Sequence, residues 1–283
     1  MHVACFSVFF GHGSRGLKGH RCVRRAVRII LIIIMKRVFS IEGNIGAGKS
    51  TLLAQLGQLP EVSVLLEPIE RWTVPTPGLK NRSALDMLYG DPVRNGFAFQ
   101  MFALLTRLEQ IGYHKNSYQT LFSERGPWSD ADIFGHTMHQ QGHMTDEEWH
   151  VYSCWSQALT HGSVLGLPKL SGIVYMRSSP RVCAERIRMR GRPSEKTIGL
   201  DYLQGLHDAH ERHIETQRAR GVPVLVMDAD ALRDDGMSQI EAALKVMEWS
   251  DNPAAADKEK EKEEEQAGAI REEPVTTLSD SNH

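Results

Sequence analysis

The chain has 283 residues and a formal net charge of −2 at pH 7. This length suffices for one α/β domain with a sizeable core plus flanking segments. The near-neutral charge gives no support for a nucleic-acid-binding surface, and no apolar run approaches the length of a membrane span. The four cysteines lie far apart and form no Cys-x-x-Cys pair, which favours a reducing compartment and no structural zinc.

Residues 1–35 form a basic extension, because no acidic residue precedes Glu42 while Arg and Lys recur from Arg15 onward. Such an acid-free leader is typical of an organelle transit peptide. An equally good interpretation is that Met35 is the true start of the protein. A secretory signal is less favoured, since no small-residue cleavage site follows the apolar residues 29–35. We therefore expect a cytoplasmic protein, or a mitochondrial one if the leader directs import.

Residues 36–42 alternate like a β-strand, and residues 51–56 continue as a helix. Between them lies the pattern Gly-x-x-x-x-Gly-Lys-Ser, a phosphate-binding loop that implies a nucleoside triphosphate substrate. Glycines let several backbone N–H groups turn towards one phosphate, and the start of the helix adds a positive dipole. Lys49 should reach the β- and γ-phosphates, and the Ser50 hydroxyl should bind Mg²⁺. The residues assigned to ATP binding here are Gly43, Asn44, Ile45, Gly46, Ala47, Gly48, Lys49, Ser50 and Thr51.

Further strand patterns follow at residues 62–66, 120–123, 172–176 and 222–227. Long helical patterns separate them, among them residues 94–113 and 146–161. Alternating strands and helices predict an α/β fold, a parallel sheet of about five strands with helices on both faces. In such a sheet the ligand lies outside the carboxyl ends of the strands. Charged residues at those ends are therefore the candidates for chemistry.

Carboxylates and an arginine follow two of these strands. Glu67 comes directly after the second strand, and Glu124 and Arg125 end the third. Phosphoryl transfer needs positioning, charge neutralisation and a nucleophile that can lose its proton. Glu67 is the candidate to accept the proton of an acceptor hydroxyl, and Glu124 the candidate to hold Mg²⁺ directly or through water. Arg125 is placed to orient Glu67 and to meet the developing charge on the phosphate.

An arginine-rich segment follows the fourth strand and ends in Arg190-Gly191-Arg192. Such a segment fits an ordinary basic, solvated helix end equally well by itself, but beside an intact phosphate-binding loop it favours a mobile lid, which closes cations over phosphates and expels water. Residues 251–283 are rich in Lys, Glu, Ala and Ser, and have too little apolar surface to offset the entropy of ordering. We therefore expect a leader at 1–35, a folded domain at 36–250 and a disordered, charged tail at 251–283.

Taken in order, these motifs resemble those of the deoxyribonucleoside kinases, the family of deoxycytidine, deoxyguanosine and mitochondrial thymidine kinases. The resemblance covers about residues 36–250. It rests on the loop at 43–51 and on shorter matches: Glu67-Pro68 with Trp72, Tyr89, Phe99-Gln100, Glu124-Arg125 with Ser129-Asp130, and Arg190-Gly191-Arg192. The family implies a P-loop NTPase-type sheet with an arginine-rich lid. It also implies ATP- and Mg²⁺-dependent phosphorylation of a deoxyribonucleoside 5′-hydroxyl in nucleotide salvage, by a homodimer.

By similarity, Glu67 is the base that acts on the sugar 5′-hydroxyl, and Arg125 supports it. Tyr89 and Glu195 are expected to hold the sugar 3′-hydroxyl. Gln100 is expected to make a bidentate contact to the edge of the base. The remaining assignments by similarity are Trp72 and Phe134 bordering the base, Arg190 and Arg192 as lid arginines, and Arg186 as a further phosphate contact.

Three positions bear on the choice of base: Ala103, Arg107 and Asp130. An Arg–Asp pair at the last two resembles the deoxycytidine and deoxyguanosine kinases, whereas thymidine-preferring relatives carry smaller, uncharged groups there. An arginine held by Asp130 could donate to the O6/N7 edge of a purine. We therefore expect deoxyguanosine, deoxyadenosine or deoxycytidine as the acceptor. Departures from the family pattern are Gly126 in place of a serine, Ala131-Asp132 in place of arginine and tyrosine, and Ser194 in place of an acid.

Two other functions fit part of the pattern. A nucleoside monophosphate kinase shares the phosphate loop and the lid, but it needs extra cations for the acceptor phosphate, which Glu67 would repel. A non-catalytic relative, of the kind found as an accessory subunit of respiratory complex I, need not keep the catalytic groups. Lys49, Ser50, Glu67 and Arg125 are all present, which favours catalysis.

Overall fold

The computed structural model describes residues 37–60, 62–75, 77–79, 81–114, 118–160, 167–192, 195, 198–231 and 236–251. All of these belong to one compact unit, Lys36–His283, and the other unit of the chain is Met1–Met35. The expected leader at 1–35 and the expected tail beyond Asp251 therefore lie outside the described residues.

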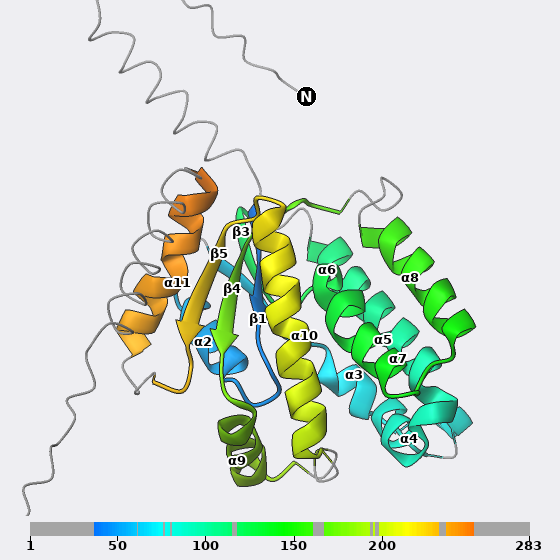
Figure 1. Cartoon of the computed structure of the whole chain (residues 1–283). Coiled ribbons are helices and arrows are strands. Elements are labelled where there is room, and N and C mark those ends of the chain that lie inside the picture. The colour runs from blue at the N-terminus through cyan, green and yellow to red at the C-terminus, as the bar shows by residue number, and fades with distance from the viewer. Residues whose placement is uncertain are drawn as a thin grey trace, which may run out of the picture. The chain divides into compact units, whose positions relative to one another are not determined.

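A sheet of five parallel strands organises the described part of the chain, in the order β2-β3-β1-β4-β5 (Figure 1). The strands are β1 Arg37–Glu42, β2 Val62–Leu65, β3 Thr120–Glu124, β4 Leu170–Arg177 and β5 Val224–Asp228. The predicted parallel α/β sheet is confirmed, and each predicted strand is present with small shifts at its ends. The last strand begins later than predicted, because Pro223 has no N–H to donate and only its carbonyl joins β4, accepting from the Ile173 N–H at 2.8 Å.

Helices occupy the connections between the strands, and α11 follows the last strand. Those nearest the site are α2 Lys49–Leu56, α3 Ile69–Thr73, α4 Ala84–Gly90, α5 Pro92–His114, α6 Pro127–Asp130, α9 Pro180–Arg190 and α10 Leu200–Ala219. The others are the 3-10 helix η1 Pro77–Leu79, the π-helix η2 Ala131–Gly135, α7 His136–Gln140, α8 Asp146–Thr160 and α11 Gly236–Asp251. The helices predicted at 51–56, 94–113 and 146–161 correspond to α2, α5 and α8, and residue 161 lies outside the described part.

The central strands β1, β3 and β4 are mostly buried on both faces, and their side chains alternate between two cores. In β1, Phe39 and Ile41 pack with residues of α2 and α11, whereas Val38 joins the opposite core with Ile111 and Trp128. Figure 1 shows α2 and α11 along one face of the sheet and α10 along the other. Because side chains of a strand point alternately to opposite faces, the same strands position both helical layers.

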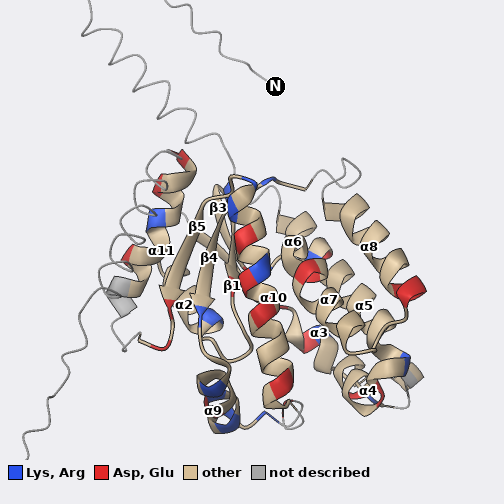
Figure 2. Ribbon diagram, viewed as in Figure 1, with Lys and Arg blue, Asp and Glu red and all other residues tan. Residues whose placement is uncertain are grey.

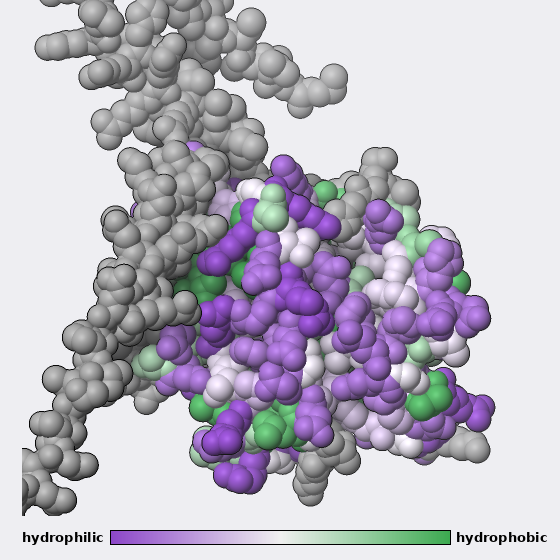
Figure 3. Space-filling view, in the orientation of Figure 1, coloured by the Kyte–Doolittle hydropathy of each residue, from purple (hydrophilic) through white to green (hydrophobic). Residues whose placement is uncertain are grey.

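The outer surface of the helices is mostly polar. In α10, Leu203, Leu206 and Ile214 are buried while Gln204 and Arg212 are exposed, as expected for an amphipathic helix. Figure 3 shows the corresponding face of the molecule as predominantly hydrophilic, with small, separate hydrophobic patches. Within the described ranges, no helix combines the length and the apolar character needed to cross a membrane.

The carboxyl ends of the strands share one edge, where the chain places its charged residues. β1 runs into the loop at 43–48, β2 leads to Glu67, and β3 ends in Glu124. The register pairs Ile41 of β1 with Glu124 of β3, so the loop that follows β1 begins next to the Glu124 carboxylate. β1 has β3 on one side and β4 on the other, and this is the switch point at which open α/β sheets bind their ligands.

Two glycines of α5 are expected to respond in opposite ways to the same substitution. A Cβ on Gly96 would lie 2.4 Å from the carbonyl oxygen of His143, a backbone atom that cannot move cheaply. Gly96→Ala should therefore lower the free energy of unfolding by ~2 kcal/mol. A Cβ on Gly112 meets nothing within 4 Å. Gly112→Ala should raise the free energy of unfolding by ~0.5–1 kcal/mol, because alanine is the better helix former. Urea unfolding of both variants beside the parent measures the changes, and equal signs would contradict this account of the packing.

Candidate active site

Two cavities lie along the carboxyl edge of the sheet, with volumes of about 910 Å³ and about 460 Å³. Gly46, Lys49, Ser50 and Glu124 line both, so the cavities border one another at the loop that follows β1. The larger one, here the deep cavity, continues past the ends of β2 and β3 to helices α3, α4 and α5. The smaller one, here the loop cavity, lies between the loop and α9.

The loop between β1 and α2 has a positive φ at all three of its glycines, Gly43, Gly46 and Gly48, a conformation that favours glycine. Gly46 has φ 84°, and a Cβ there would lie 2.8 Å from the carbonyl oxygen of Cys183. Gly48 has φ 96° and stands at the N-terminus of α2. The loop is also tied to α10, because Asn44 Nδ2 donates to a backbone carbonyl of that helix at 2.8 Å. These backbone angles and this hydrogen bond define the shape of the loop, and the start of α2 is directed at the cavities.

Lys49 is buried beside this loop. Its Nζ donates to the Asn44 carbonyl at 2.9 Å and lies 3.9 Å from Glu124 Oε1. Burial and the nearby charge of Arg125 lower the pKa of Lys49 to about 8, and they outweigh the opposite effect of Glu124. An ammonium group so poorly solvated is stabilised by any anion that approaches it. This end of the site is therefore suited to negative charge.

Ser50 and Glu124 form the candidate metal site. The Ser50 hydroxyl lies 3.0 Å from each oxygen of Glu124. Hydroxyl and carboxylate oxygens are ligands that Mg²⁺ accepts, and this ion keeps several waters, so one or two protein oxygens suffice beside phosphate oxygens. Throughout the described ranges, no group of three or more His, Cys, Asp or Glu side chains could hold a metal ion. The pair fits an ion that phosphate oxygens also bind.

Glu67 has a guanidinium group on each carboxylate oxygen. Arg125 Nη1 donates to Oε2 and Arg107 Nη2 donates to Oε1, both at 2.5 Å. Burial by itself would raise the pKa of Glu67, but Arg125 and Arg107 outweigh it and hold that pKa at about 2. Glu67 is therefore an ionised carboxylate at neutral pH, and it lines the deep cavity.

The backbone of Arg125 contributes to this arrangement. Its φ of 52° is unusual for a residue with a side chain, and such strain concentrates at functional sites. The turn lets the side chain reach back from the end of β3, so that Nη1 meets Glu67 and Nη2 lies 3.3 Å from the Gly43 carbonyl. Arg125 thus joins the ends of β1, β2 and β3.

Arg107 joins Glu67 to a second buried carboxylate. Its Nη1 donates to Asp130 Oδ1, and the other oxygen of Asp130 accepts from the Tyr152 hydroxyl at 2.6 Å. Burial raises the pKa of the Asp130 carboxyl, while Arg107 and Tyr152 counteract that rise. Asp130 lies behind Arg107, whereas Arg107 and Ala103 line the deep cavity. Any influence of Asp130 on a ligand therefore passes through its neighbours.

Aromatic rings and guanidinium groups share the wall of the deep cavity. Arg125 Cζ lies 4.8 Å and Arg107 Cζ 5.6 Å from the ring centre of Phe134. Arg107 Cζ also lies 5.0 Å from the ring centre of Trp72, whose Nε1 donates to Thr106 Oγ1 at 3.0 Å. These contacts hold both rings in fixed orientations at the cavity. Flat faces of this kind are what a planar heterocycle packs against.

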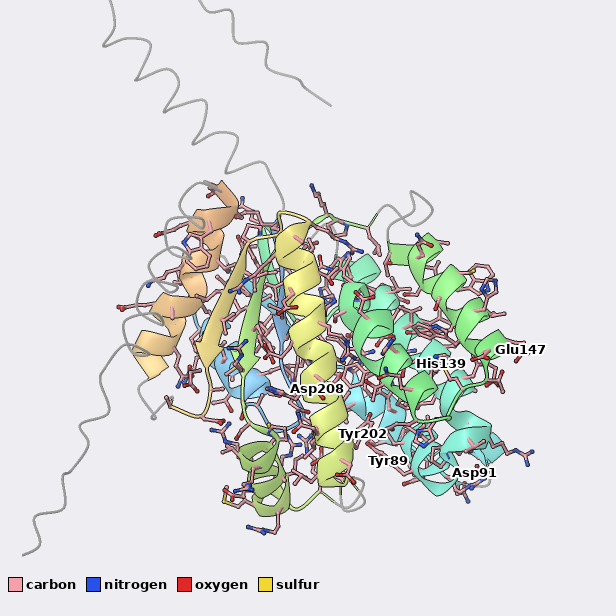
Figure 4. All side chains as sticks on the ribbon, in the orientation of Figure 1. Tyr89, Asp91, His139, Glu147, Tyr202 and Asp208 are labelled. Atoms are coloured by element: carbon pink, nitrogen blue, oxygen red, sulfur yellow. The ribbon has the colours of Figure 1, made fainter. Side chains whose placement is uncertain are left out.

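Tyr89 and Tyr202 reach the deep cavity from α4 and α10 (Figure 4). Burial, together with Tyr202 and Glu195 nearby, raises the pKa of the Tyr89 hydroxyl, so it remains a hydrogen-bond donor at any ordinary pH. Glu195 lines the same cavity, and its carboxylate accepts from Arg190 at 2.7 Å and from Arg192 at 3.4 Å. Hydroxyl and carboxylate groups are thus available at this end of the cavity.

Arginines of α9 and of the residues that follow it surround the loop cavity. Arg186, Arg190 and Arg192 line it, and Figure 2 shows the concentration of basic residues on α9. Arg186 Nη2 donates to the Ala229 carbonyl at 2.8 Å, which anchors this helix to the segment after β5. Together with Lys49, these arginines give the loop cavity a positive potential that suits phosphate groups.

The structure brings the residues predicted from the sequence to one place. They line one or both cavities, with the exception of Gly43, Asn44 and Asp130, which support the loop or Arg107 from behind. Sequence reasoning misses Thr106, Tyr152 and Tyr202. The local sequence does not mark any of these three as a site residue, because the partner or cavity that each contacts is formed by another helix or strand.

The charge on Glu67 is expected to stabilise the fold. Its pKa in the folded protein is about 2 against an ordinary value of 4.5, so its contribution is fully present above pH 4.5 and is lost as the pH falls towards 2. Glu67→Gln should lower the free energy of unfolding by about 3 kcal/mol at pH 7, and by ~1 kcal/mol less at pH 3.5. Denaturant titrations at both pH values measure this.

The matched control is Glu109→Gln, which removes a carboxylate paired with Arg71 at the surface. It should change the free energy of unfolding by less than ~1 kcal/mol. A destabilisation by Glu67→Gln that is the same at both pH values would contradict the electrostatic explanation.

Comparison with known proteins agrees with this geometry. Residues 39–248 match the deoxynucleoside kinase family. The chain is 36% identical over 195 residues to the probable deoxycytidine kinase of fowlpox virus, covering 68% of this chain and 78% of the relative. It is 36% identical over 216 residues to human deoxycytidine kinase, covering 68% and 83%. It is 31% identical over 217 residues to the mitochondrial deoxyguanosine kinase of Xenopus laevis, covering 68% and 80%. The chain belongs to the deoxynucleoside kinase family and is an enzyme that phosphorylates nucleosides.

Proposed function

We propose that this enzyme transfers the γ-phosphoryl group of ATP to the 5′-hydroxyl of deoxyguanosine, deoxyadenosine or deoxycytidine, and so serves nucleotide salvage. One observation carries the proposal. The glycine-rich loop and a carboxylate that two arginines keep ionised at neutral pH line one continuous cavity. That combination fits a phosphate donor on one side and a neutral hydroxyl acceptor on the other. The relatives named above are kinases of deoxycytidine and deoxyguanosine, which supports the same acceptor class.

ATP is proposed to bind with its phosphates in the loop cavity. The backbone N–H groups at the start of α2 and the Lys49 ammonium would hold the β- and γ-phosphates. Arg186, Arg190 and Arg192 would neutralise the phosphates from the other side as a lid. Ser50 and Glu124 would hold Mg²⁺, which supplies charge neutralisation to the transferred group when bound.

Glu67 is proposed to bind the attacking 5′-hydroxyl and to receive its proton. A carboxylate with a pKa of about 2 is a weak base, so its main contribution is orientation of the hydroxyl. This is sufficient because phosphoryl transfer has a largely dissociative transition state, in which positioning and charge stabilisation dominate. Arg125, which holds Glu67 and lies near the loop, would meet the negative charge on the transferred phosphoryl group.

The nucleoside is proposed to fill the deep cavity. Trp72 and Phe134 would enclose the planar base, and Gln100 would hydrogen-bond its edge. Tyr89 and Glu195 would hold the 3′-hydroxyl. Glu195 accepts hydrogen bonds from Arg190 and Arg192, so binding of the sugar to its carboxylate would compete with these arginines and would couple acceptor binding to movement of the lid.

The reaction is tested by incubating the full chain with Mg-ATP and each of deoxycytidine, deoxyguanosine, deoxyadenosine and thymidine. Transfer to the first three over thymidine is the expected result. A preference for thymidine would contradict the assignment of the base but would still support the kinase activity. Transfer to a nucleoside monophosphate alone would make the protein a monophosphate kinase.

In the same assay Glu67→Gln should lower turnover by ~100-fold or more while ATP binding is unchanged, because the carboxylate that orients the hydroxyl and receives its proton is removed and the phosphate-binding loop is not altered. Glu215→Gln alters an exposed carboxylate on α10 and serves as the control. Turnover of Glu67→Gln at the parent rate would contradict the role of Glu67 in binding the hydroxyl and accepting its proton.

A second copy of the chain is the proposed protein partner. Exposed apolar side chains gather on two helices in contact, Leu105 on α5 and Val151 and Trp155 on α8. Trp155→Glu should convert a homodimer to a monomer in sedimentation analysis, whereas Val93→Glu, at another exposed position of α5, should leave the dimer intact. A parent chain that sediments as a monomer would remove this proposal.

Binding to nucleic acid is not expected at a net charge of −2. We propose a cytoplasmic location, or a mitochondrial one if residues 1–35 act as a transit peptide.

A further inference from the structure

Arg186 is held differently from the other two arginines that line the loop cavity. Its Nη2 donates to the backbone carbonyl of the residue after β5 at 2.8 Å, and its Nη1 donates to the Ser178 hydroxyl, directly after β4, at 3.5 Å. Arg190 and Arg192 instead donate to the Glu195 carboxylate, in the segment that follows α9. Arg186 is thus bound to the ends of two strands, and the other two arginines to a residue beyond the helix.

One carboxylate joins the segments that follow β4 and β5. Asp230 Oδ1 accepts from the Ser178 hydroxyl at 2.5 Å, and Oδ2 accepts from the Ser179 N–H at 2.9 Å. The Asp228 carboxylate accepts from the Asp230 N–H at 3.0 Å, which fixes the turn that presents Asp230. Burial would raise the pKa of Asp230, but the hydrogen bonds from Ser178 and Ser179 and the charge of Arg186 outweigh it and lower that pKa. Asp230 is therefore ionised at neutral pH.

The direction of these hydrogen bonds decides how Ser178 faces Arg186. An ionised carboxylate can only accept, so the single hydrogen of the Ser178 hydroxyl points at Asp230. Ser178 is buried, so water does not compete for this hydrogen, and the neighbouring Cys183 thiol is only a weak hydrogen-bond partner. The lone pairs of the same oxygen are then left for Arg186, which can only donate. The carboxylate thus orients the guanidinium group through the hydroxyl.

Packing fixes the same part of α9 against the glycine-rich loop. A Cβ on Gly46 would lie 2.8 Å from the Cys183 carbonyl oxygen and 3.3 Å from Ile187 Cγ1, so α9 lies directly on the loop. The side chains of Cys183 and Ile187 are buried in the core that contains residues of α2. Arg186 lies between these two positions, so its backbone cannot shift without disturbing that packing. The other two arginines lie at the end of α9 or beyond it.

We propose that Ser178 and Asp230 are positioning residues for the phosphate donor, because they hold Arg186 in place at the loop cavity. The triphosphate meets a fixed cation in Arg186 and movable cations in Arg190 and Arg192. The inference rests on the proposed function, since it takes the phosphates of a nucleoside triphosphate to be the ligand of the loop cavity. It follows that a donor bound without any nucleoside already depends on the Ser178–Asp230 pair.

Removal of Asp230 separates this inference from simple electrostatics. ATP carries several negative charges, so the loss of a nearby carboxylate would by itself strengthen its binding. In the arrangement described here, the same loss frees the hydrogen of Ser178, and the hydroxyl no longer presents a fixed acceptor to Arg186. Binding of the donor should then weaken. The sign of the change in affinity for Asp230→Ala therefore distinguishes positioning from charge repulsion.

The test measures, by calorimetry, the Kd of the full chain for AMP-PNP, a non-hydrolysable ATP analogue, with Mg²⁺ and without nucleoside. The KM for ATP, the KM for the preferred nucleoside and kcat are measured beside it. Ser178→Ala and Asp230→Ala should each raise the Kd for AMP-PNP and the KM for ATP by ~5-fold, because Arg186 loses one of its two hydrogen bonds. The KM for the nucleoside should change by less than ~2-fold.

Three further variants serve as controls. In an Arg186→Ala background, Ser178→Ala should have no further effect on the Kd, since the residue it positions is gone. Asp208→Ala removes an exposed carboxylate of α10 that lines neither cavity, and should keep the Kd within ~2-fold of the parent. Ser179→Ala removes the side chain that caps α9, and should lower the temperature of thermal unfolding without a change in the Kd.

Unchanged or tighter AMP-PNP binding by folded Ser178→Ala and Asp230→Ala variants would overturn the inference. So would an equal effect of Ser178→Ala with and without Arg186, or equal losses of affinity for donor and nucleoside, as a purely structural role would produce. If thermal unfolding shows that Asp230→Ala is not folded, Ser178→Ala decides, because it leaves the cap of α9 intact. Weaker AMP-PNP binding in the variants, with no transfer to any nucleoside by the parent, would overturn the proposed function and leave this inference standing. A parent that does not bind AMP-PNP would overturn both.

Discussion

Glu67 and Asp130 are carboxylates withdrawn from water, and Arg107 lies between them with one terminal nitrogen on each. A buried charge that loses its partner costs several kcal/mol, so each of them depends on that guanidinium group. Because Arg107 lies on α5, these two ion pairs hold α5 against the end of β2 and the segment that follows β3. Gln100 and Ala103 precede Arg107 by seven and four residues, so helical geometry brings them to the same cavity wall. The wall of the deep cavity is therefore a consequence of one ion-pair network.

The same electrostatics divide the site into two ends of different character. At the loop, Lys49 is so weakly compensated that its pKa falls to about 8, and arginines of α9 add further positive charge. At the acceptor end, the arginines are already committed to Glu67 and Asp130. An anion gains most at the first end, and a neutral hydroxyl is best accommodated at the second. The charge distribution thus favours an anion at one end of the site and an uncharged group at the other.

Much of the fold and of the site could be predicted because the relevant signals are local. The apolar strands, the glycine-rich loop and the charged residues directly after β2 and β3 each occupy a few consecutive positions, and a parallel sheet brings its carboxyl ends to one edge. The start of β5 is displaced because Pro223 has no N–H, an effect that a count of apolar residues does not register. The placement of Asp130 behind Arg107 could not be read from their spacing, since it depends on how α6 packs against α5.

By itself, then, the sequence determined the class of fold, the glycine-rich loop after β1 and the residue types at the ends of the strands, because these follow from periodicity and from contiguous motifs. Only the tertiary structure decided that Glu67 is shared by two arginines, that the strained backbone of Arg125 returns its side chain to β2, and that the Tyr152 hydroxyl reaches Asp130. Each of these contacts joins residues from different helices and strands. Their distances and hydrogen-bond directions are fixed by packing between elements, which no run of neighbouring residues encodes.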